Sequence, residues 1–203
     1  MAHETEQSGL NRRDALRAIV GGMGAAASAV WVSDLMVLAE EQAVHAHLLS
    51  VAPQGSTAWS PSVLSARQMV TVGTLVELII PTTETPGAKA ALVDRFIDGV
   101  LTTATPLVRD RFTGGLAWLD ARSTALFNAP FHSATAAQQA DLLTRLAAAT
   151  SAEEAAGTQF FTALKSMTIT GYYSTEIGLR QELGDDGILM AASFPGCTHP
   201  EHQ

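Results

Sequence analysis

Apolar side chains between residues 65 and 183 recur every three or four positions, which is the spacing that places them on one side of an α-helix. No stretch of the chain sustains the alternation of apolar and polar residues that is typical of a strand packed on a core. The pattern therefore predicts an all-α fold without a sheet. We expect a compact domain of about five to six helices.

Capping and stop residues mark the ends of the predicted helices. Ser65 is a candidate N-cap for the first helix, which Pro81 ends. Thr135 and Gln138 form a capping-box sequence before the fourth helix, and the glycines at 114–115 are expected to weaken the third. The predicted helices cover about residues 65–80, 88–101, 106–126, 135–146, 151–167 and 174–183.

Two segments of the domain are predicted to be turns. Residues 81–87 hold a proline near each end, so we expect a loop there that stops one helix and starts the next. The β-branched residues 168–170 precede Gly171, and we expect the fifth helix to fray at this point. Tyr172 and Tyr173 would then lie in a turn with their rings buried.

The N-terminal residues carry the layout of an export signal. Arg12 and Arg13 are followed by Leu16 and then by an uncharged run, residues 18–32, that is rich in Gly and Ala. This arrangement resembles a twin-arginine signal. As a helix the run would be about 22 Å long, which is shorter than the roughly 30 Å hydrocarbon core of a bilayer. We therefore interpret residues 1–32 as a signal segment.

The remaining chain divides into a connecting segment and one domain. Residues 33–64 are predicted to be transitional, with a short helix near 34–41 followed by a linker. Residues 65–203 are predicted to form the all-α domain with an extended C-terminal tail. Residues 27–29, Ala-Ser-Ala, are a candidate cleavage site for the signal. The alternative is that the signal is retained as an N-terminal anchor helix.

Charge and motifs argue against nucleic-acid binding and against catalysis. The formal net charge is −8 at pH 7, and no Lys/Arg cluster lies beyond the signal, whereas a nucleic-acid site needs a cationic face. The sequence lacks the Gly-rich nucleotide fingerprints, the nucleophile elbow and the His-Glu-x-x-His zinc motif. Its carboxylates lie on patterns that predict solvated helix faces, among them Asp94, Asp98, Glu176 and Glu182. We therefore expect a protein that is not an enzyme.

Cys197 is the only cysteine of the chain. The flanking prolines 195 and 200 favour an extended segment outside the core. In an oxidising compartment an unpaired cysteine indicates a bond to another chain, a bound ligand or a reactive site. A tail thiol without any role is the alternative interpretation.

A metal site is a further interpretation of the same tail. Cys197, His199 and His202 are potential ligands at short spacing, and His45 and His47 are the candidates to complete the four ligands of a structural zinc site. The Cys-x-x-Cys-His sequence that attaches haem is absent. A metal- or haem-binding electron carrier is thus an alternative function.

Four strings of the domain carry a family resemblance: Leu78–Ala88, Val93–Asp98, Gly171–Gly178 and Pro195–His199. With these strings in this order, the chain between Ser65 and His199 resembles the gluconate 2-dehydrogenase subunit 3 family. Members of this family are the small subunits of membrane-associated, flavin-dependent sugar and sugar-acid dehydrogenases.

The resemblance implies a non-catalytic accessory subunit of a hetero-oligomer. A large flavoprotein subunit carries the FAD and performs the oxidation, and a cytochrome c or another membrane electron-transfer subunit takes the electrons. FAD, an iron-sulfur cluster and haem are accordingly expected in partner subunits, and no cofactor is expected in this chain. The small subunit escorts the large one through the twin-arginine route, which implies a periplasmic, membrane-associated complex. The alternative is a structural subunit of another membrane electron-transfer complex.

The resemblance also implies roles for single residues. Cys197 becomes the candidate for a disulfide to the catalytic subunit, which would hold the two chains together after export. Tyr172, Tyr173, Trp59 and His199 are candidates for the partner interface, because aromatic side chains are enriched in such surfaces.

Overall fold

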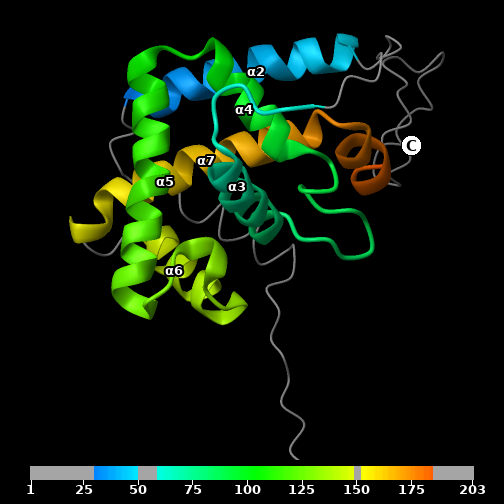
Figure 1. Cartoon of the computed structure of the whole chain (residues 1–203). Coiled ribbons are helices and arrows are strands. Elements are labelled where there is room, and N and C mark those ends of the chain that lie inside the picture. Colours follow the sequence, from blue (N-terminus) through cyan, green and yellow to red (C-terminus); the bar gives the residue numbers. More distant parts are fainter. Residues whose placement is uncertain (1–29, 50–58, 149–151, 185–203) are drawn as a thin grey trace, which may run out of the picture.

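The computed structural model describes residues 30–49, 59–148 and 152–184, and no strand occurs within these ranges. The predicted all-α fold is therefore confirmed (Figure 1). Its α-helices are α2 (Val30–Leu49), α3 (Ala66–Ile79), α4 (Val93–Thr103), α5 (Pro106–Phe127), α6 (Ala136–Ala148) and α7 (Ala155–Tyr173). Short helical turns complete it: η1 (Phe131–Ser133), η2 (Ala152–Glu154) and the π-helical η3 (Ile177–Glu182).

Helix α7 is the centre of the domain. It packs against α2, α3, α4, α5 and α6, and Figure 1 shows it running through the middle of the molecule with α5 crossing one of its ends. Phe160, Leu164 and Met167 of α7 are all buried in the core. Removing such side chains from water is the main stabilising contribution of a helical domain.

Glycines allow α5 and α7 to approach closely. A Cβ added to Gly115 of α5 would collide with the ring of Phe160, and one added to Gly157 of α7 would collide with Trp118. Phe112 and Phe160 meet edge to face there, with ring centroids 5.3 Å apart. The glycine pair therefore does not interrupt α5, because Gly115 is the site where the helices cross.

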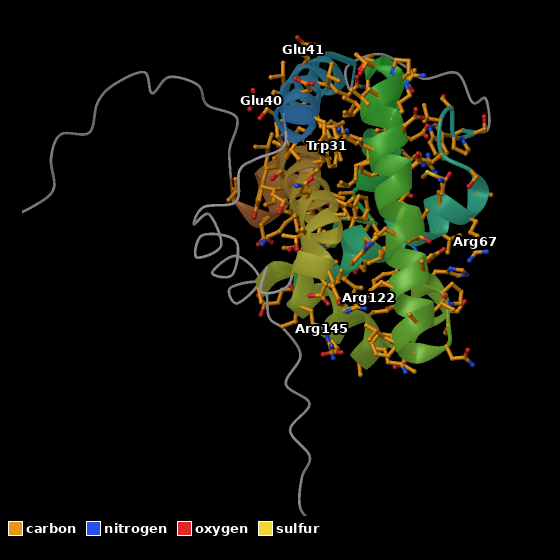
Figure 2. All side chains as sticks on the ribbon, turned by 90° about the vertical axis from the view of Figure 1, so that its left-hand side faces the viewer. Trp31, Glu40, Glu41, Arg67, Arg122 and Arg145 are labelled. Carbon is orange, nitrogen blue, oxygen red and sulfur yellow. The ribbon has the colours of Figure 1, made fainter. Side chains whose placement is uncertain are left out.

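Helix α2 covers the predicted short helix at 34–41 and is longer, because it begins at Val30, within the predicted signal segment, and continues to Leu49. Trp31, Val32, Leu35 and Ala39 are buried in the same core as the rest of the domain. Figure 2 shows the position of Trp31 in this helix. The core thus extends to residues before 65. The helical periodicity of apolar residues in α2 is weak in the sequence, because α2 also has apolar side chains on its outer side, including the exposed Val37.

Three predicted helix boundaries differ in the structure. Residues 88–92 form turns, so the second predicted helix begins only at Val93. Helix α7 does not fray at Gly171 but continues to Tyr173, because Gly171 is the contact point for the ring of Phe96. The predicted last helix, 174–183, is reduced to the short π-helical η3.

The local capping predictions are confirmed where the structure describes them. Ser65 and Gln68 form a capping box at the start of α3. Before α6, the amide of Thr135 donates to Gln138 Oε1 at 2.9 Å, and the amide of Gln138 donates to Thr135 Oγ1 at 3.3 Å. Ser151 and Glu154 also have the spacing of a capping box, but Ser151 lies outside the described residues.

The helices that the structure describes include none whose length and apolar character would allow it to span a membrane.

Candidate docking surface

Several of the predicted site residues lie outside the described part of the chain. These are Arg12, Arg13 and Leu16 of the signal and Cys197, His199 and His202 of the tail; the same holds for the side chains of His45 and His47. Within the described ranges, no group of three or more His, Cys, Asp or Glu side chains is placed to hold a metal ion.

Tyr172 is completely buried, whereas its neighbour Tyr173 is half-buried. The two rings meet edge to face, with centroids 5.2 Å apart. The phenol group of Tyr172 donates a hydrogen bond to the carbonyl oxygen of Pro86 at 2.8 Å. Tyr172 therefore exposes no surface in this fold, and its phenol group holds the loop that contains Pro86.

The loop at residues 81–87 is confirmed, and three elements anchor it. The amide of Thr82 donates to Glu77 Oε1 of α3 at 2.8 Å, and the amide of Gly87 donates to Thr82 Oγ1 at 3.0 Å. On the other side, Thr85 Oγ1 donates to Glu182 of η3. A Cβ on Gly87 would lie 2.6 Å from the amide nitrogen of Thr82, so only glycine allows this tight closure. The loop is therefore part of the rigid framework, with residues 82–84 exposed.

Asp98 of α4 is a buried carboxylate, and the prediction of a solvated position is wrong for this residue. Its side chain is 2% exposed and accepts three backbone hydrogen bonds. The donors are the amides of Ser62, Val63 and Leu64, at 2.6, 3.0 and 2.8 Å. Hydrogen bonds to the charged form of a buried carboxylate offset the cost of its burial. Asp98 thereby holds residues 62–64 against α4. Figure 1 shows the segment before α3 passing over α4.

Trp59 lies at the start of that segment and is 44% exposed. The guanidinium carbon of Arg95, on the first turn of α4, lies 4.7 Å from the centroid of the indole ring. This is the geometry of a cation–π contact, which favours one orientation of both side chains. The pair presents an ordered apolar and cationic surface.

Two leucines that lie within predicted helices, Leu92 and Leu183, are exposed at the surface of the structure. Leu92 is 48% exposed and adopts the left-handed conformation, with φ of 58°. Leu183, after η3, is 61% exposed. The sequence carries no signal for the turn at Leu92, because a left-handed leucine replaces the glycine or asparagine that normally marks such a turn.

Glu154 is a second buried acid among the described residues, and its contact also stabilises the fold. Glu154 of η2 accepts a hydrogen bond from Arg122 of α5 at 3.1 Å (Figure 2). Asp98 and Glu154 thus each satisfy a local structural need, and neither faces the other as an acid and base would.

Comparison with known families identifies one match. Residues 66–188, more than half of the chain, match the family described as gluconate 2-dehydrogenase subunit 3. The searches of curated proteins and of solved structures returned no match. The matched range contains the anchored loop, Asp98 and the two tyrosines. The chain therefore belongs to the gluconate 2-dehydrogenase subunit 3 family.

Proposed function

We propose that this chain is a non-catalytic small subunit that binds a flavin-dependent catalytic subunit and escorts it through twin-arginine export. The observation that carries the proposal is the family match over residues 66–188. The Arg12-Arg13 pair ahead of an uncharged run supports the export step. In this proposal the complex is periplasmic and membrane-associated, and its FAD, iron-sulfur cluster and haem belong to partner subunits.

The position of the core is consistent with removal of the signal. Among the described residues, the first buried side chains are those of Trp31 and Val32, and the candidate cleavage site is residues 27–29. Cleavage there leaves the core residues of α2 in the mature chain. The proposed signal is therefore shorter than the 1–32 segment expected from the sequence.

The proposed bond to the catalytic subunit is a disulfide from Cys197. A disulfide keeps the two chains in one molecule, so their contact surfaces remain at a high effective concentration relative to each other. The complex therefore persists after dilution in the periplasm. His199 beside this cysteine and the half-buried Tyr173 are proposed to contribute to the contact.

The escort role is tested by replacing Arg12 and Arg13 with lysine in cells that also express the catalytic subunit. We expect both chains to accumulate in the cytoplasm, and fractionation with an activity assay measures this. Arg17→Lys is the matched control, because it makes the same change outside the arginine pair. Wild-type amounts of the flavoprotein in the periplasm of the double variant would reject the escort role.

The disulfide is tested by electrophoresis of the purified complex without and with reductant. We expect a heavier band that disappears on reduction and is absent from Cys197→Ser. Since the chain has no other cysteine, persistence of the band in this variant would exclude the proposed bond.

A further inference from the structure

We infer that the catalytic subunit docks on one end of the molecule, the docking face, formed by residues 59–65, residues 81–95 and residues 177–183. This inference rests on the proposed function and adds the location of the contact. Its apolar anchors are Trp59, Leu92 and Leu183, and Arg95 supplies a cation beside them.

The three segments of the docking face are joined by direct contacts. Arg95 of α4 connects Trp59 to the residues that follow the loop. Tyr172 and Glu182 bind the loop from the other side. Figure 1 shows residues 81–92 and η3 at the same side of the molecule.

Exposed apolar side chains gather on this face. Among the described residues, the large hydrophobic side chains with the greatest exposure are Val37, Trp59, Val70, Leu92, Leu107 and Leu183, and three of them belong to the docking face. Tryptophan and arginine are the residue types most enriched among those that dominate binding energy in interfaces. Trp59 with Arg95 is such a combination.

The face is ordered before any partner arrives. Asp98 holds the backbone that carries Trp59, and the loop is held by hydrogen bonds from α3, α7 and η3. Leu92 keeps its side chain at the surface at the cost of a left-handed backbone. A surface that is already ordered loses less conformational entropy on binding, which favours association.

The end of the described chain points to the same face. Gly184, two residues after the end of η3, is the last described residue, and Cys197 lies thirteen residues after it. Thirteen residues reach at most about 45 Å in any conformation, so a partner cysteine that bonds to Cys197 lies within about that distance of Gly184. The partner surface we expect is apolar, with a pocket for Trp59, a carboxylate opposite Arg95 and a cysteine within this distance.

The test measures the affinity of the full chain for the catalytic subunit in a Cys197→Ser background, so that only the non-covalent contact is observed. Trp59→Ser and Leu92→Asn are the test variants; asparagine tolerates the left-handed conformation, so the fold is retained. We expect each to raise the Kd at least about tenfold. The control, Leu107→Ser, removes a leucine of α5 that is more exposed than Leu92, at 63% against 48%, and is expected to change the Kd less than about twofold. Thermal unfolding checks that all variants are folded.

The outcomes separate the two levels of the proposal. Wild-type affinity for both test variants would reject the docking face and leave the accessory role intact. Failure of the parent Cys197→Ser chain and of the unsubstituted chain to bind the flavoprotein would reject the proposed function itself.

Discussion

The phenol oxygen of Tyr172, in the last turn of α7, lies 2.8 Å from the carbonyl oxygen of Pro86 and donates a hydrogen bond to it. The bond joins two of the strings by which the family resemblance is seen in the sequence, and it links the central helix to an exposed loop. Tyrosine is a residue type that is enriched in interfaces, but Tyr172 is buried and instead holds the loop of the proposed docking face.

Replacing Tyr172 with phenylalanine keeps the ring and removes this hydrogen bond. We expect the free energy of unfolding to fall by about 1 kcal/mol. Hydrogen exchange should accelerate at the backbone amides of Gly87 and Thr82, because the hydrogen bonds that these amides donate hold the loop. The amides of α6 serve as the internal control. If the loop amides exchange at the same rate in the variant as in the wild type, the loop is not anchored by Tyr172.

Asp98→Asn tests the buried carboxylate. The amide side chain has the same shape, but it offers a single acceptor oxygen and turns two donors toward backbone amides that also donate. We expect a loss of about 2 kcal/mol or more in denaturant unfolding. Asp94→Asn, one turn earlier on α4, is the control, and it should change stability by less than about 0.5 kcal/mol. Equal effects of the two substitutions would refute the special role of Asp98.

The glycines of α5 are predicted to respond in opposite directions. A Cβ on Gly114 meets no atom within 4 Å, so Gly114→Ala should stabilise the helix by about 0.5–1 kcal/mol through its higher helix propensity. Gly115→Ala places a methyl group against Phe160 and should destabilise by about 1–3 kcal/mol. Both values come from thermal or denaturant unfolding, and stabilisation by both alanines would contradict the packing at the α5–α7 crossing.

Lys165 of α7 is predicted to make stability depend on alkaline pH. Its side chain is half-buried, with Nζ 5.9 Å from the centroid of the Phe161 ring, and burial lowers the pKa of its ammonium group. Between this lowered pKa and the unfolded value of about 10.4, the unfolded chain binds more protons, so stability rises with pH across that interval. Below the pKa that Lys165 has in the folded chain, the cost of burying its charged ammonium group is present in full.

The variant Lys165→Met removes that titration. We expect it to be more stable than the wild type near pH 7, with a difference that shrinks as the pH rises toward 10.5. Denaturant unfolding between pH 7 and pH 10.5 measures the difference. A constant difference over this range would show that the burial of Lys165 carries no charge penalty.

The predictable parts of the molecule are those whose partners are close along the chain. The capping pairs at Ser65 and Thr135 bind amides three residues away, and the loop at 81–87 ends at its own prolines. The unpredictable parts depend on distant partners. The sequence pattern predicts a solvated position for Asp98, because the groups that donate hydrogen bonds to it lie 34 to 36 positions earlier in the chain. They are backbone amides, which carry no signal in a sequence.

The sequence by itself determined the helical class, most helix positions and the family, because helical periodicity and capping act over a few residues. Only the tertiary structure decided that α2 belongs to the core, that Gly115 and Gly171 are contact points, and that Trp59, Leu92 and Leu183 remain exposed. The physical reason is that burial is a property of the packed chain: an apolar side chain looks the same in a sequence whether a second helix covers it or not.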